Sequence, residues 1–526
     1  MEQPTATQRV VKYLSKSRLN DFKQCPKKLW LQTHRPELRE DSPNARSAFA
    51  TGDRVGELAR LEHPDGILIE HADNLALAIG DTKAALRRSP RVPIFEATVE
   101  AGGVLIRADL LLPTERGWHL TEVKSTGQVK PVHLPDLAVQ AWVLRQSGVD
   151  VATVELRHLD KSFVYGGDES YDGLLRAGEV KDGSLQDAIE ALQGEVPQWI
   201  AAGLAAVNAA LPELAVGTQC QQPYPCPFLG HCSSDAPPQP LYPVSLLPGH
   251  RGKRLSRLLE AEGFTDLRAV PQDRIADPLL QRIHAASVSG QAWMDVEGAR
   301  RAVAGWGYPR AFLDFETIAP SVPVWAGTRP FQQVPFQWSA HIESAPGKLC
   351  WAEFLDLSGR NPSRTCAEAL VRTLRDCASI VAYSASTERS VVRRLAGLYP
   401  DLSVELLGLA GRIVDLLPVV AEHYYHRDMR GSMSLKPVFE TLAPNVSHAD
   451  LEEVQDGRGA QDAYDEAVNP RTGPTRREQL RERLSKYCAL DTWAMVVVLA
   501  RLTGQAGVPS LGANLLASDG SCRSLA

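Results

Sequence analysis

Three charged residues in the first half of the sequence have the types and spacing of a metal-dependent hydrolytic site. Asp109 ends the apolar part of one expected strand, and Glu122 and Lys124 alternate on the next. Alternate residues of a strand point to one face, so the three side chains can meet across a hairpin. Two carboxylates there can hold a hard divalent cation, and the lysine can orient a water that attacks phosphorus. The alternative interpretation is an exposed strand with a salt bridge.

A second acidic group lies in the last third of the sequence. Asp314 and Glu316 alternate on an apolar strand, and Tyr487 and Asp491 are one turn apart on the last long helix. Glu388 falls in the first turn of a helix between them. Burying like charges together is costly unless a cation compensates. Carboxylates from three elements therefore suit a two-metal phosphoryl-transfer site.

Cysteines suggest a third site. Cys220, Cys226 and Cys232 recur at even intervals, and Cys25 precedes Pro-Lys-Lys near the N-terminus. Four thiolates can close an iron–sulfur cluster or a zinc site. The alternative is a set of incidental thiols in a loop. Four further cysteines fall on apolar faces and are interpreted as core residues: Cys350, Cys366, Cys377 and Cys488.

The elements that must position these residues form two α/β patterns. The first half predicts strands at 95–99, 104–112 and 118–123 and then a helix at 136–146, which carries Gln140. The second half predicts strands before alternating helices and strands, which favours a mixed sheet. Its expected strands are 311–318, 336–342, 351–355 and 380–384, and its expected helices are 363–377, 387–398 and 475–502.

A proline-rich stretch separates the two patterns. Prolines are dense between 237 and 248, which favours an extended linker, and two helices are expected after it at 253–262 and 278–286. We therefore predict a first domain at 1–235, a linker and helical module at 236–307, a second α/β domain at 308–503 and a loose tail at 504–526.

Composition limits the class of protein. The chain has 526 residues, 44% of them hydrophobic and 23% charged, with a net charge of −6. This balance excludes a disordered or collagen-like chain, and any nucleic-acid site must be a local basic groove. The apolar run at 493–500 stops at Arg501, short of a membrane span, and the first twenty residues lack a signal-peptide core. We therefore expect no membrane partner and a cytoplasmic location with reduced thiols.

Several other residues are weaker candidates. Aromatic side chains near the second acidic group can stack on bases, namely Trp325 and Phe331. Basic or imidazole side chains can contact phosphates, namely Lys130, His133, Arg310, Arg329 and Lys436. For both sets the ordinary alternatives are core packing and a solvated charge. Asp415 is interpreted as a helix cap or turn residue.

The first half resembles the iron–sulfur PD-(D/E)XK nucleases, a group that includes RecB-type nucleases and the nucleases of CRISPR adaptation. The resemblance covers roughly residues 13–235 and rests on the order of Cys, Asp, Glu-x-Lys, Gln and three clustered Cys. It implies that Asp109 and Glu122 are metal ligands, that Lys124 is catalytic and that Gln140 orients the substrate or the lysine. It further implies a 4Fe–4S cluster held by Cys25, Cys220, Cys226 and Cys232.

The sequence departs from that family in two places. Many relatives carry a metal-binding histidine four residues after a glycine, where this chain has Gly56 followed by Glu57. The tyrosine of the family's Gln-x-x-x-Tyr motif is replaced by Leu144. The cysteine spacing is also wider than the Cys-x-x-Cys step common in relatives.

The second half resembles the DEDD 3'–5' exonucleases of the RNase H-like fold, in their tyrosine subclass. The resemblance covers roughly residues 309–503 and implies that Asp314, Glu316 and Asp491 are ligands of Mg²⁺ or Mn²⁺. It implies that Tyr487 orients the nucleophilic water. Glu388 stands where those enzymes usually have aspartate.

The two-part layout is similar to an uncharacterised bacterial family that fuses these halves. The sequence thus predicts a metal-dependent nuclease acting on single-stranded DNA or duplex ends, in repair, processing or defence. An RNA substrate, a DNA-binding module with one inactive half and a structural iron–sulfur subunit are the alternatives. Protein partners are not predicted.

Overall fold

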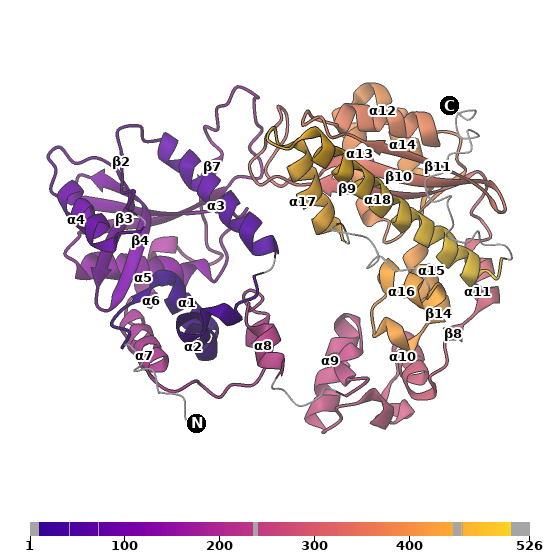
Figure 1. Cartoon of the computed structure of the whole chain (residues 1–526), viewed down its shortest axis with the longest axis horizontal. Helices are drawn as coiled ribbons and strands as arrows, with labels where there is room; N and C mark the ends of the chain where they lie inside the picture. Colours follow the sequence, from indigo (N-terminus) through magenta and orange to yellow (C-terminus); the bar gives the residue numbers. More distant parts are fainter. Residues whose placement is uncertain are drawn as a thin grey trace. The chain divides into compact units, whose positions relative to one another are not determined.

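The computed structural model describes residues 10–41, 43–71, 73–234, 240–444, 454 and 456–505. Its internal contacts divide the chain into two compact units (Figure 1). The first comprises Met1–Pro238 and Pro320–Gln332, and the second comprises Gln239–Ala319 and Gln333–Ala526. This division groups the expected helical module with the second unit. Most of the expected tail, from residue 506 onward, lies outside the described residues.

The first unit is built on a mixed seven-stranded sheet. Its strand order is β2 (Ile67–Leu68), β3 (Ile94–Ala101), β4 (Val104–Thr114), β5 (Gly117–Lys124), β6 (Val151–Leu159) and β7 (Leu175–Ala177), with β1 (Leu14–Ser15) paired to β4. Strands β3 to β5 are antiparallel, whereas β5 and β6 run parallel because helix α5 (His133–Gln146) connects them. The three predicted strands and the predicted helix are confirmed.

Helices cover this sheet and close its core. They are α1 (Lys16–Gln24), α2 (Pro26–His34), α3 (Pro43–Leu61), α4 (Leu75–Leu86), α6 (Leu185–Leu192), α7 (Val196–Asn208) and α8 (Leu229–Ser234). The main apolar cluster joins side chains of β3, β4 and β5 to α5 and α7. Most of helix α5 is buried, including its polar residues Asp136 and Gln140, which therefore face protein and not solvent.

The segment Pro320–Gln332 belongs to the first unit although it lies between two strands of the second. Tyr165 N donates to Thr328 O over 3.0 Å, and Gly327 N donates to Tyr165 O over 2.8 Å. Phe331 packs on a small apolar cluster that includes Phe95 and Val123. Phe331 therefore follows the ordinary alternative of core packing, since its ring is partly buried against this cluster of the first unit.

The second unit is built on a mixed five-stranded sheet, in the order β11 (Lys348–Leu355), β10 (Val334–Ala345), β9 (Arg310–Ile318), β12 (Ser379–Ala382) and β13 (Ile413–Asp415). The β9, β10 and β11 strands are antiparallel, whereas β12 and β13 run parallel to β9. The predicted mixed sheet and the α/β class are confirmed.

Both faces of this sheet are covered by helices. Leu313 and Phe315 pack with α12 (Ser363–Leu374), α13 (Ser386–Leu398) and α14 (Ser403–Arg412). Phe312 packs on the other face with α18 (Pro474–Leu502). Side chains of a strand alternate, so Asp314 and Glu316 share the α18 face with Phe312. The pleat of β9 therefore aims both carboxylates at the helix that carries Tyr487 and Asp491.

The remaining helices share the core on the α18 side. They are α9 (Gly249–Ala261), α10 (Pro278–Ser289), α11 (Val296–Val303), α15 (Leu416–His423), α16 (Leu435–Leu442) and α17 (Gly457–Val468), with β8 (Trp293–Met294) paired to β14 (Tyr424–Tyr425). Asp415 caps α15 by accepting a hydrogen bond from Leu417 N over 3.0 Å, as predicted. Within the described part of the chain, no helix has both the length and the apolar character needed to cross a bilayer.

Arg310 forms an ion pair inside the second unit. Its Nε lies 2.6 Å from Glu343 Oε2, and the two side chains are 8% and 3% exposed. The expectation that Arg310 contacts phosphate is therefore wrong, because its charge is used inside the protein between β9 and β10.

We expect Arg310→Ala to lower the free energy of unfolding by about 3–5 kcal/mol, because it leaves Glu343 buried without its partner. The double variant Arg310→Met/Glu343→Leu should lose much less, because no charge is then stranded. Urea denaturation of the full-length variants measures both values. Equal losses in the two variants would mean that packing, and not the ion pair, dominates at this position.

Candidate functional site

The first acidic group assembles where β4 and β5 pair. Leu110 lies opposite Thr121 in the antiparallel register, which places Asp109 beside Glu122. Asp109 Oδ2 accepts a hydrogen bond from Val123 N over 2.7 Å, so its carboxylate is fixed against the backbone of β5. The structure thus brings together the two carboxylates that the sequence singled out.

Cationic and amide groups surround Glu122. Lys124 Nζ and Gln140 Nε2 both donate to this carboxylate. Lys16 Nζ lies 3.1 Å from Glu122 Oε1, and Lys124 Nζ also lies 2.7 Å from Asp136 Oδ2. Gln140 Oε1 is buried and has no hydrogen-bond partner among the described residues. Lys16 and Asp136 were not predicted to belong to this site.

The pKa values of Asp109 and Glu122 shift in opposite directions. Burial raises the pKa of Asp109 well above its usual range, and the nearby Glu122 charge adds to the rise. Burial alone would raise the pKa of Glu122, but Lys124 and Lys16 outweigh it and hold that pKa below its usual value. Burial lowers the pKa of His133 to about 4, with Lys124 acting in the same direction. The two lysines therefore favour the charged form of Glu122, whereas burial favours the neutral form of Asp109.

The position that replaces the family's histidine makes a different contact. Glu57 on α3 forms an ion pair with Arg54 at 3.1 Å, and its side chain is 53% exposed. Leu144, which stands where relatives have tyrosine, is fully buried in the apolar core. The described contacts of Glu57 and Leu144 do not include a carboxylate of the first acidic group.

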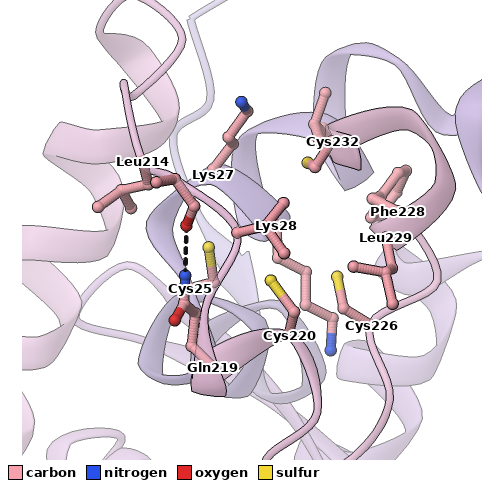
Figure 2. A pocket seen from close by; sticks show the side chains of 13 residues that line it. Cys25, Lys27, Lys28, Leu214, Gln219, Cys220, Cys226, Phe228, Leu229 and Cys232 are labelled. Carbon is pink, nitrogen blue, oxygen red and sulfur yellow. Dashed lines mark hydrogen bonds between the residues drawn. The ribbon is translucent and has the colours of Figure 1, made fainter. Parts of the chain in front are cut away.

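The four cysteines Cys25, Cys220, Cys226 and Cys232 line one pocket. Figure 2 shows their sulfur atoms turned toward a common space. Cys25 stands between α1 and α2, whereas the other three come from the loop and short helix near residue 220–234. The structure therefore brings together thiols that are nearly two hundred positions apart in the sequence.

Hydrogen bonds hold this pocket together. Gln24 Nε2 donates to Gln219 O over 2.8 Å and to Tyr224 O over 2.7 Å, which ties α1 to the cysteine loop. Cys226 N donates to Cys220 O over 2.8 Å. Lys27 and Lys28 line the same pocket. Burial raises the pKa of Cys226, and Lys28 opposes that rise.

This pocket fits a thiolate-held metal centre. Four sulfur donors converge, apolar side chains line the remainder, and two lysines can balance negative charge. Both an iron–sulfur cluster and zinc use such donors.

The second acidic group lies between β9 and α18. Ligand atoms of Asp314, Glu316 and Cys488 all lie within 4.8 Å of one another. Cys488 Sγ is 3.9 Å from Asp314 Oδ2. Cys488 is fully buried, as the sequence predicts for a core residue, but its contact with Asp314 was not predicted.

The other predicted residues of this group surround Asp314. Burial raises the pKa of Asp314 well above its usual range, and the charges of Asp491, Glu316 and Glu388 add to it. Burial also raises the pKa of Glu388 to about 7, and its Oε2 has no hydrogen-bond partner among the described residues. A divalent cation would relieve this accumulation of carboxylates.

Tyr487 and Lys436 belong to the surroundings of the second acidic group. A hydrogen bond joins Tyr487 to Asp491, and burial together with the nearby carboxylates raises the pKa of the Tyr487 hydroxyl. Lys436 Nζ lies 5.0 Å from the centre of the Tyr487 ring, and its charge lowers the pKa of Glu316 against the effect of burial. Lys436, one of the candidate phosphate contacts, thus lies beside Tyr487 at the second acidic group.

Comparison with known proteins gives one match. Residues 311–434 match a family described as a domain of unknown function, DUF2779. The matched region contains Asp314, Glu316 and Glu388. No curated protein and no solved structure matches the chain.

Proposed function

We propose that the chain is a metal-dependent nuclease that hydrolyses phosphodiester bonds of DNA, with one site in each unit. The observation that carries the proposal is the second acidic group. Ligand atoms of Asp314, Glu316 and Cys488 lie within 4.8 Å of one another. The charges of Asp491 and Glu388 also act on Asp314, and Glu388 Oε2 has no hydrogen-bond partner among the described residues. Such a cluster is unfavourable alone and favourable around divalent cations.

The finer assignment of the two folds is part of this proposal. A PD-(D/E)XK fold for the first unit is supported by Asp109 on one strand, Glu122 and Lys124 on the next, and Gln140 on the following helix. An RNase H-like fold for the second unit is supported by Asp314 and Glu316 on the central strand of a mixed sheet. Helix α18 packs on the same face and carries Tyr487 and Asp491.

The chain's own residues would act around the cation in defined ways. A bound Mg²⁺ or Mn²⁺ supplies Lewis acidity and a more acidic water. In the second site the Tyr487 hydroxyl, bonded to Asp491, is placed to orient the attacking water. In the first site the Lys124 ammonium, fixed between Glu122 and Asp136, is placed to orient water or to stabilise charge on the phosphate.

The thiol pocket is proposed to hold a 4Fe–4S cluster. Its donors come from Cys25 at the start of the first unit and from Cys220, Cys226 and Cys232 near its end. A cluster there would cross-link segments that are also joined by the two hydrogen bonds of Gln24 and by apolar packing of α1 and α2 with α7.

A second candidate function applies to the first unit alone, which could grip DNA without cutting it. The observation that favours it is the neutralisation of Glu122 by Lys16 and Lys124, which competes with a cation for this carboxylate. RNA remains the alternative substrate for the second unit.

Digestion of end-labelled nucleic acids tests the proposal. Single- and double-stranded DNA and RNA are incubated with the full-length protein and Mg²⁺ or Mn²⁺, and Lys124→Ala and Asp314→Ala are run beside the wild type. Each variant should lose the cleavage that depends on its own unit. Failure of the wild type to cut any of the four substrates would contradict the proposal.

We expect Lys124→Ala to abolish the cleavage by the first unit, by about a hundredfold or more, while folding and DNA affinity change little. The lysine acts on the chemical step, and its removal leaves Lys16 on Glu122. Gel assays of cleavage in an Asp314→Ala background measure the effect. Unchanged cleavage in that background would favour a first unit that only binds.

A further inference from the structure

The backbone at Lys16 is fixed by the secondary structure of the first unit. It is the first residue of α1, and Ser15 caps that helix by accepting from Arg18 N over 3.3 Å. The preceding strand β1 pairs with β4, with Leu14 opposite Val104. The backbone that presents Lys16 is therefore held by the sheet, and its side chain is only 19% exposed.

The Lys16 ammonium meets carboxylates that already have a partner. Its Nζ lies 3.1 Å and 3.4 Å from the two Glu122 oxygens and 3.5 Å from Asp136 Oδ2. Lys124 binds the same two carboxylates. The two ammonium groups repel each other, but their charges match those of the two carboxylates that they share, so the arrangement is balanced as long as no further cation binds.

Cation binding changes this balance. A divalent cation held by Glu122 would compete with Lys16 for the oxygens of this carboxylate, whereas Lys124 would keep its short contact with Asp136. The anion that arrives at this place is the phosphate of the substrate. Lysine binds phosphate as a compact point charge on a flexible stem.

We propose that Lys16 is a phosphate-binding residue of the first site, which holds Glu122 before the cation binds and contacts the scissile phosphate afterwards. This inference rests on the proposed nuclease function, because it assigns the phosphodiester backbone as the ligand of Lys16. The two lysines of the first site then have different roles: Lys124 orients the attacking water, and Lys16 binds the phosphate.

Two binding measurements on the full-length protein test the proposal without relying on cleavage. The background is Asp314→Asn, which removes a ligand of the second site. The variants are Lys16→Ala, Lys16→Arg and the control Lys83→Ala, which removes an exposed lysine from α4 of the same unit. The first measurement is Mn²⁺ affinity by calorimetry. The second is the salt dependence of binding to a duplex oligonucleotide with phosphorothioate linkages, in the presence of Mn²⁺.

We expect Lys16→Ala to bind Mn²⁺ about tenfold more tightly, because a positive charge that competes with Mn²⁺ for Glu122 has been removed. The slope of log K against log salt should fall by about 0.9 in magnitude, the value for one lost phosphate contact. Lys16→Arg should keep the slope, and Lys83→Ala should change neither quantity.

If Lys16 had only a structural role, its replacement would not tighten Mn²⁺ binding and would not lower the salt slope. Weaker Mn²⁺ binding together with an unchanged salt slope in Lys16→Ala would overturn the proposal. Absence of cleavage by the wild type would contradict the nuclease function, but the Mn²⁺ affinities and salt slopes would still decide whether Lys16 contacts phosphate.

Discussion

Full-length protein purified without oxygen is expected to be brown and to contain about four irons per chain, the content of one 4Fe–4S cluster. The reason is the pocket in which Cys25 meets Cys220, Cys226 and Cys232. Lys27 and Lys28 line the same pocket, and the Lys28 ammonium is paired with Asp21 at 2.7 Å. Metal analysis and the visible absorption spectrum measure the iron content directly.

Cys226→Ala should lose the iron and lower the unfolding temperature of the first unit, since the cluster is expected to join the two ends of that unit. Cys366→Ala is the matched control, because Cys366 is buried in the second unit and lies outside the pocket. That control should keep its iron. Stoichiometric zinc with no iron in the wild type would contradict the cluster and favour a zinc centre with the same four ligands.

Metal binding at the second site should be visible as a rise in melting temperature. With Mg²⁺ or Mn²⁺ at a hundredfold excess over its Kd, mass action stabilises the folded state by about 2.7 kcal/mol. Asp314→Asn should lose the part of this shift that comes from the second site, because Asp314 lies at the centre of its carboxylates. The same variant should also lose the exonuclease activity of the second unit.

Tyr487→Phe separates chemistry from binding. Its melting shift should equal that of the wild type, whereas cleavage should be slower by about a hundredfold or more, because only the water-orienting hydroxyl is removed. Asp376→Asn serves as the control for Asp314→Asn, since Asp376 is an exposed aspartate of the same unit. Identical metal shifts in Asp314→Asn and Asp376→Asn would contradict a metal site at Asp314.

Local periodicity accounts for what the sequence could predict about the fold and the acidic groups. Asp314 and Glu316 share a face because side chains of a strand alternate, and Tyr487 and Asp491 share one because a helix repeats nearly every four residues. The elements that carry them were therefore predictable within a few residues at each end. The clustering of these residues follows from the way β9 and α18 pack.

Long-range contacts account for what the sequence could not predict. Lys16 reaches Glu122 from a helix more than a hundred positions away, and no local spacing signals that approach. Asp136 looked like an ordinary residue in the first turn of a helix, but α5 is buried and turns it toward Lys124. Arg310 looked solvated and is in fact paired inside the protein with Glu343.

The segment Pro320–Gln332 belongs to the first unit but is synthesised after the first part of the second unit. The first unit takes its core from residues before 239, and Phe331 packs partly buried against a small apolar cluster of that unit, so all of its parts are present only after residue 332 has left the ribosome. At about 5–20 residues per second, synthesis of residues 239–332 takes about 5–20 s, during which the surface meant for Phe331 stays uncovered. A gene split in the linker would leave the first product without this ring unless the second product supplied it. The first unit of the full chain thus uses a segment that is encoded after the linker.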